Sequence, residues 1–91
     1  MAKVVWPQSV VAQLNEITAY IARDDPTAAD RIARRLIALG ESLSVFPNRG
    51  SPASGGARVM SGVPPYLLRY RLIDDIVVII DIRHGRRLPP S

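Results

Sequence analysis

The densest group of side chains suited to catalysis or ligand binding in this 91-residue sequence lies near its end, in the segment 83–87. Arg83, Arg86 and Arg87 carry planar guanidinium groups, which suit phosphate and carboxylate. His84 is the only histidine, a residue type that can act as a general base near neutral pH. Because the last ten residues contain no acid, we expect this segment to bind an external partner. The alternative for His84 is that it only packs and forms hydrogen bonds at a strand end.

Two further arginines, Arg69 and Arg71, alternate with apolar residues in a run typical of a β-strand. The alternation puts them on one face with Leu67, while the other face takes Tyr66, Leu68, Tyr70 and Leu72. We interpret that face as a basic, partly apolar platform for RNA, DNA or an acidic protein segment. The alternative is that both arginines are solvated and pair with Asp81 or with nearby turn aspartates, which contributes little.

The register of this strand depends on its connection to the next one. If Asp74-Asp75 forms a two-residue hairpin loop, Arg69 lies opposite Ile80 and Arg71 lies opposite Val78. A shift of one residue would exchange the two faces of the strand.

Several kinds of chemistry lack their usual residues. The absence of cysteine excludes disulfides, thiol nucleophiles and thiolate metal sites, and one histidine without a carboxylate cluster predicts no metal. The sequence has no glycine-rich phosphate loop, nucleophile elbow or paired carboxylates at helical spacing, so hydrolase, kinase and oxidoreductase functions lose their usual support and no cofactor is expected. We expect Trp6 and Phe46 to lie in the core and not to stack on bases.

Composition indicates one small basic domain spanning residues 1–91. The net charge is +4, and residues 57–91, with six basic and three acidic groups, carry +3 of it. Eleven of the twelve basic residues are arginine, a bias that a GC-rich genome can also produce. No apolar run reaches the ~18 to 20 residues needed to span a membrane, and no signal peptide begins the chain, so we expect a cytoplasmic protein without membrane partners.

The hydrophobic pattern predicts a strand at residues 2–6 followed by two antiparallel helices within residues 7–46. The first helix has an apolar stripe at three- and four-residue spacing and stops near Asp24. The second is expected to begin with Asp25 as its N-cap and Pro26 in its first position. Its stripe consists of Ala29, Ile32, Ala33, Leu36, Leu39, Gly40 and Leu43.

The second half of the chain predicts a sheet. Residues 47–56 form a surface loop rich in glycine, proline and serine, and a short strand follows at residues 58–60. After a second turn at residues 62–65, strands are expected at 66–73 and 76–83. The order β-α-α-β-β-β predicts an α+β sandwich of two layers, in which the helical hairpin covers a three-stranded antiparallel sheet.

In order and spacing this pattern resembles the RelE/ParE superfamily of bacterial toxins over nearly the whole chain. The matching residues are Val5-Trp6, Leu14, Ile17, Tyr20-Ile21, Pro26, Ala28-Ala29, Leu43, Pro47, Gly50, Arg58, Pro65-Tyr66, Tyr70-Arg71 and the closing 82–87 segment. The resemblance implies the toxin of a type II toxin-antitoxin module, of the kind known in plasmid stabilisation. It also implies an acidic, ParD-like antitoxin, encoded beside the toxin, that folds onto its surface.

The resemblance leaves two targets. RelE-like toxins cleave mRNA in the ribosome with basic residues and a late tyrosine or a histidine, whereas ParE-like toxins poison DNA gyrase and cleave nothing. Leu67 stands where RelE has a catalytic arginine, no tyrosine follows Tyr70, and Lys3 is the only lysine. Ser51 also departs from the shared pattern, where an arginine often follows the loop glycine. These departures favour a gyrase inhibitor that is not an enzyme.

Site roles follow from that interpretation. We expect Arg83, His84, Arg86 and Arg87 to bind the target, and Arg58, Arg69 and Arg71 to bind the antitoxin. If the chain is instead a ribosome-dependent endoribonuclease, His84 and Arg87 are the candidate catalytic residues. A non-toxic protein-binding module is the third alternative.

Overall fold

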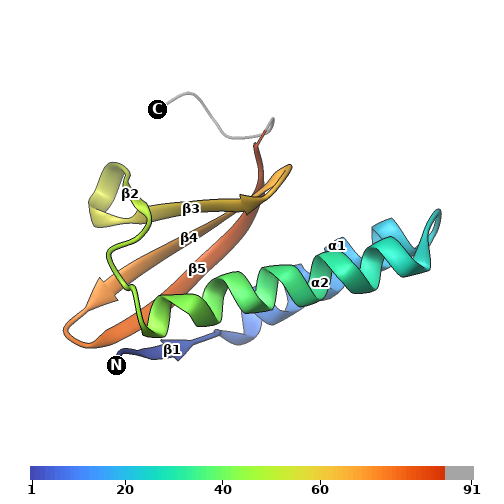
Figure 1. The fold of residues 1–91 in the computed structure, drawn as a ribbon. Helices are drawn as coiled ribbons and strands as arrows, with labels where there is room; N and C mark the ends of the chain where they lie inside the picture. Colours follow the sequence, from blue (N-terminus) through green and yellow to red (C-terminus); the bar gives the residue numbers. More distant parts are fainter. Residues whose placement is uncertain (86–91) are drawn as a thin grey trace.

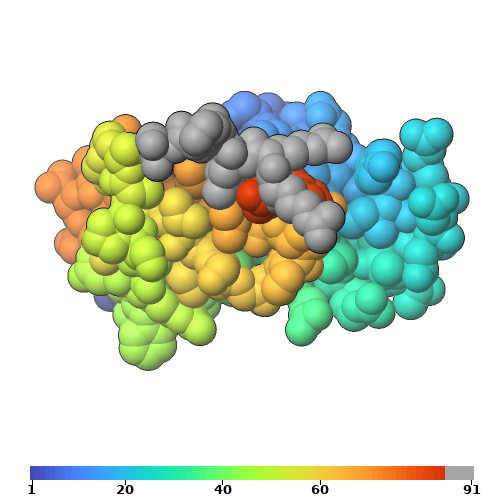
Figure 2. All heavy atoms as spheres, turned by 90° about the horizontal axis from the view of Figure 1, so that it is seen from above, coloured from blue at the N-terminus to red at the C-terminus, as the bar shows by residue number. Residues whose placement is uncertain are grey.

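The computed structural model describes residues 1–85, where two antiparallel helices pack against one face of a single sheet (Figure 1; all heavy atoms are drawn in Figure 2). The helices are α1 (Gln8–Ala22) and α2 (Pro26–Glu41). The strands are β1 (Lys3–Val5), β2 (Ser51–Pro52), β3 (Arg58–Val63), β4 (Tyr66–Ile73) and β5 (Ile76–His84). Short 3-10 turns lie at Ser42–Ser44 and Ser54–Gly56. The predicted α+β sandwich of two layers is confirmed.

Local signals position the helical hairpin as expected. The side chain of Asp25 accepts a hydrogen bond from the Ala28 amide at 3.0 Å, and Pro26 occupies the first helical position. Both features satisfy backbone requirements at a helix start. The helices then meet through small residues, and Gly40 is buried where the ring of Trp6 packs against it. Trp6 therefore joins the edge of the core, as predicted.

The end of the hairpin differs from the expectation in two respects. The second helix stops at Glu41 and tightens into the 3-10 turn, so it does not reach residue 46. The prediction that Phe46 lies in the core is wrong, since its side chain is 62% exposed. The turn buries Leu43 and rotates the following residues outward, which the apolar pattern did not indicate.

The sheet has more strands than the predicted three-stranded meander. Within residues 1–85 its order is β1-β5-β4-β3-β2. β1 pairs in parallel with β5, for example through Val4 and Val77, because the helical hairpin supplies the long crossover that a parallel pair needs. The loop after α2 adds Ser51–Pro52 to the opposite edge, antiparallel to β3.

The hairpin of β4 and β5 turns at Asp74-Asp75, and Asp74 adopts the positive φ of 54° that such short loops require. Arg71 lies opposite Val78, as predicted. The register then shifts at a β-bulge. At a bulge, two residues of one strand lie opposite a single residue of the neighbouring strand. The predicted pairs beyond it are therefore shifted by one residue.

The core lies between the helices and the inner face of the sheet. Its members are Val10, Leu14, Leu36, Leu43, Met60, Val63, Leu68, Tyr70, Val77, Ile79 and Ile82. Leu68 and Tyr70 are fully buried, which confirms the predicted inward face of β4. The alternate residues of β4 consequently point to the other side, which we call the outer face of the sheet.

Candidate functional site

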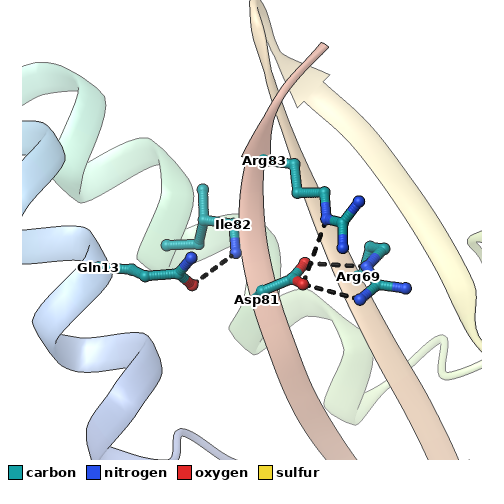
Figure 3. Close-up of polar contacts among 5 residues, drawn as sticks. All are labelled: Gln13, Arg69, Asp81, Ile82 and Arg83. Atoms are coloured by element: carbon teal, nitrogen blue, oxygen red, sulfur yellow. Dashed lines mark hydrogen bonds and ion pairs between the residues drawn. The ribbon is translucent and has the colours of Figure 1, made fainter. Parts of the chain in front are cut away.

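The outer face holds an ion network centred on Asp81 (Figure 3). Arg69 donates to its two oxygens from Nε at 2.9 Å and from Nη2 at 2.8 Å, so the pair has two parallel hydrogen bonds. Arg83 adds a hydrogen bond from Nε at 3.3 Å. We call these three residues the Asp81 network. It joins two strands and fixes both guanidinium groups relative to one carboxylate.

The network exists because of the bulge. The sequence placed Ile80 opposite Arg69, and that prediction is wrong: the register shift between Arg69 and Tyr70 brings Asp81 there. The alternative in which Arg69 pairs with Asp81 is thereby confirmed. The arginine and aspartate side chains are only 24% and 17% exposed, so water screens their interaction less than at an open surface.

The network shifts the titration of its members. Burial alone raises the pKa of Asp81, but hydrogen bonds and charge attraction from Arg69, and then from Arg83, outweigh it and leave the pKa below its ordinary value. The pKa of Arg69 is raised, mainly by its hydrogen bond to Asp81 and against the effect of burial. At neutral pH the network is therefore one carboxylate between two cations, with one positive charge in excess and further N–H donors available for an anion.

The other two arginines assigned to the antitoxin lie apart from this network. Arg71 is exposed, and its guanidinium lies beside the backbone of Gly55 and Gly56. A Cβ atom built on Gly55 would stand 3.6 Å from Nη2 of Arg71, and one built on Gly56 would stand 3.1 Å from Nη1. Arg58 stands across from Tyr70, on the inner side of β3.

Arg58 and Tyr70 hold the loop that precedes β2. Arg58 donates to the carbonyls of Gly50 and Asn48 at 3.1 and 3.0 Å. The hydroxyl of Tyr70 donates to the Pro47 carbonyl at 2.7 Å and accepts from the Gly50 amide at 2.9 Å. These contacts give Arg58 a clear structural role, which the sequence did not indicate.

His84 lies on the opposite side of β5 from Arg83, because neighbouring residues of a strand alternate. Its ring meets Tyr66 edge to face, with centroids 5.7 Å apart and planes at 84°. Both rings line a cleft of about 390 Å³ together with Glu16, Ile17, Tyr20 and Ile82. The structure thus does not bring Arg83 and His84 into one surface, and Arg86 and Arg87 lie outside the described residues.

A second concave surface lies between α1 and α2. This groove of about 450 Å³ is lined mainly by small and apolar side chains: Leu14, Asn15, Thr18, Ala19, Ala22, Ala29, Asp30, Ala33 and Ile37. Ile37 is 43% exposed there. Small side chains of both helices form the walls of this groove, and its apolar lining can pack against a partner segment.

Sequence reasoning missed the placement of Glu16 and Tyr20 and gave too little weight to Asp81. Asp81 was considered only as one possible partner of the strand arginines, although it is the one acid of β5. Glu16 and Tyr20 on α1 gave no sign that they face the strand ends. Within residues 1–85, no group of histidine and acidic side chains could hold a metal ion, and no helix is long and apolar enough to cross a membrane.

Comparisons with known proteins agree with this architecture. The family described as "ParE toxin of type II toxin-antitoxin system, parDE" matches residues 4–89. Toxin RelE2 of Caulobacter vibrioides is 43% identical over 97% of this chain and 100% of its own length. The putative toxin Y4kP of Sinorhizobium fredii is 32% identical over 98% and 94%. A solved structure, the chromosomal ParDE system of P. aeruginosa, has a TM-score of 0.78 over 92% of this chain and 96% of its own, with 19% identity, and so shares the fold.

Proposed function

Since this chain belongs to the RelE/ParE superfamily and is a toxin of a type II toxin-antitoxin system, we propose that it inhibits DNA gyrase without cleaving nucleic acid. One observation carries the proposal: His84 and the strand arginines lie on opposite faces of the sheet. Cleavage of RNA needs a general base or acid and fixed cations around the same phosphate. Among the described residues, neither face offers both.

The two faces fail as ribonuclease sites for different reasons. The cleft of His84 is lined by the carboxylate of Glu16 and by no arginine or lysine of the described chain, so it repels a phosphate. The outer face carries Arg69 and Arg83, but the carboxylate beside them, Asp81, is bonded to both and has a lowered pKa, so it is a poor general base. Leu67, opposite Arg83, adds no polar group to that face.

Ribosome-dependent cleavage of mRNA is the second candidate, because a relative 43% identical to this chain is named RelE2. In that case His84 and Arg87 would be the catalytic residues, and Arg87 lies outside the described part of the chain. Two assays separate the candidates. Purified protein is added to gyrase with supercoiled DNA, and the accumulation of cleaved complexes is measured; the same protein is added to a translation reaction, and the mRNA ends are mapped.

We expect gyrase-dependent DNA breaks and intact mRNA. Codon-position cuts that disappear in the His84→Ala variant would refute the proposal and establish the ribonuclease. Expression that does not arrest growth, in cells lacking any antitoxin, would instead favour the non-toxic binding module.

We further propose that an acidic, ParD-like antitoxin covers the hairpin groove and the outer face. The groove supplies apolar area, and Arg69, Arg71 and the excess charge of the Asp81 network attract an acidic segment. Arg58 contributes by holding the loop that leads into the edge strand β2. The protein encoded by the adjacent reading frame is the reagent for this test: saturable binding that weakens in Ile37→Asp supports the proposal, and absence of binding contradicts it.

Target binding is proposed for Arg83, His84, Arg86 and Arg87. Removing residues 83–91 is a poor test, because Arg83 and His84 belong to β5. The double variant Arg86→Ala with Arg87→Ala changes no residue of the described helices or strands. It should lose growth arrest and keep antitoxin affinity within about tenfold, or 1.4 kcal/mol.

The matched control is Arg34→Ala with Arg35→Ala, which removes the same charge from the exposed surface of α2. It should remain toxic. Equal toxicity of both double variants would exclude the two tail arginines from the target surface.

A further inference from the structure

The cleft of His84 arises where β5 extends beyond β1. β1 pairs with β5 only from Ile76 to Val78, so α1 borders the rest of that edge. The side-chain oxygen of Gln13 accepts a hydrogen bond from the Ile82 amide at 3.0 Å and takes the place of a strand there (Figure 3). Beyond this contact α1 and the end of β5 separate (Figure 1). The cleft opens between them and is a fixed product of the fold.

The residues that line the cleft differ in charge from the chain as a whole. Tyr20 is 69% exposed, and the rings of Tyr66 and His84 lie beside it in the same cleft. Glu16 supplies a carboxylate, and no arginine or lysine of residues 1–85 lines the cleft, although the whole chain carries a net charge of +4. This is an aromatic and acidic site on a basic protein.

We propose that this cleft binds an arginine side chain of a partner protein. A guanidinium is attracted to the faces of tyrosine rings and forms paired hydrogen bonds with a carboxylate, so Tyr20, Tyr66 and Glu16 together match its two modes of recognition. The alkyl stem of the arginine packs on Ile17, which is half-buried at the same wall. Phosphate groups are disfavoured by Glu16, so the occupant is a protein segment and not a nucleic acid.

The cleft includes His84, which is proposed to bind the target, but it differs from the outer face in the charge that it attracts. The outer face attracts acidic groups, whereas the cleft attracts a basic one, and the two lie on opposite sides of the sheet. A partner that places an arginine in the cleft therefore gains orientation as well as affinity, because an acidic residue cannot substitute there.

The test uses a small probe and the full chain. N-acetyl-arginine methylamide is titrated into isotope-labelled protein, and the ring resonances of His84, Tyr20 and Tyr66 are followed by NMR. N-acetyl-citrulline methylamide, which has nearly the same shape and no charge, is the control ligand. We expect saturable shifts with the arginine probe and at least about tenfold weaker binding of citrulline, a difference of 1.4 kcal/mol.

Exposed residues supply the variants, so their folding is not at risk. Glu16→Gln should weaken binding of the arginine probe about tenfold, and Tyr20→Ala about threefold, as expected for an exposed cation–π contact. Glu41→Gln, which removes one carboxylate at the far end of α2, should change nothing.

Three results would overturn the proposal. The first is equal binding of both probes, and the second is the absence of saturable shifts. The third is binding of the arginine probe that appears only after residues 86–91 are deleted. That result would mean that arginines of the chain itself, and not those of a partner protein, occupy the cleft.

Discussion

Breaking the pair of Arg69 and Asp81 should destabilise the protein in a way that shows coupling between the two side chains. The perturbations are Arg69→Met, which keeps most of the stem, Asp81→Asn, which keeps the shape, and the double variant. Each single change leaves a partly buried charge without its main partner. The double variant removes both charges, so it should cost less than the sum of the single changes.

The magnitude follows from the geometry. The pair has two hydrogen bonds of 2.9 and 2.8 Å, and its side chains are 24% and 17% exposed. Hydrogen bonds to charged groups contribute about 1.5–3 kcal/mol, and full burial is absent here, so we expect each single variant to lose about 2 kcal/mol. In a domain of this size that lowers Tm by roughly 8–16 °C. The coupling energy should be about 1 kcal/mol or more.

The assay is urea unfolding of the four proteins at pH 7 and low salt, with one cooperative transition required of each. The matched control is Arg34 with Asp30, an ion pair of 3.0 Å on α2 whose side chains are 79% and 64% exposed. Exposed helix pairs of this spacing contribute only about 0.3–0.5 kcal/mol. If the losses from Arg69→Met and Asp81→Asn simply add, to within about 0.3 kcal/mol, the Asp81 network is an ordinary surface contact and our reasoning about the outer face is refuted.

Further outcomes follow from other contacts. Tyr70→Phe should cost about 2–3 kcal/mol in the same unfolding assay, because it leaves the buried amide of Gly50 and the partly buried carbonyl of Pro47 without their partner; a loss below about 0.5 kcal/mol would show that the loop is held otherwise. Gly40→Ala should destabilise by roughly 1–2 kcal/mol despite the better helix propensity of alanine, since its Cβ would overlap the ring of Trp6, and a gain in Tm would contradict that contact. The lowered pKa of Asp81 means that its stabilisation is complete at neutral pH and is lost as pH falls through a folded-state pKa below the ordinary 3.8. The stability difference between the wild type and Asp81→Asn should therefore stay constant down to about pH 5 and shrink below it, whereas shrinkage near pH 7 would assign the effect to another group.

The sequence determined the parts of this protein that depend on neighbours along the chain. Asp25 and Pro26 start the second helix, and Asp74-Asp75 makes the hairpin, because caps and short turns need only a few consecutive residues. Alternation in β4 also gave the buried face of Tyr70 correctly. The family resemblance rested on these same local patterns, and the family match over residues 4–89 confirmed it.

The candidate site was less predictable, because its residues meet across the sheet. Had the last strand been expected to extend to residue 84, alternation would have separated Arg83 from His84. Ending the strand at residue 83 left both residues in a single cluster. The prediction for Phe46 failed similarly, because the 3-10 turn after α2 changes which residues face the core.

Tertiary structure alone decided the bulge and what it brings together. The shift between Arg69 and Tyr70 replaces Ile80 by Asp81 as the residue opposite Arg69 and so creates the ion network. No signal in either strand announces it, because a bulge reflects how the whole sheet twists beneath the two helices and not the preferences of the residues that form it. The parallel pairing of β1 and the cleft beside Glu16 have the same origin, since strand register and helix placement are set by burial of the shared core.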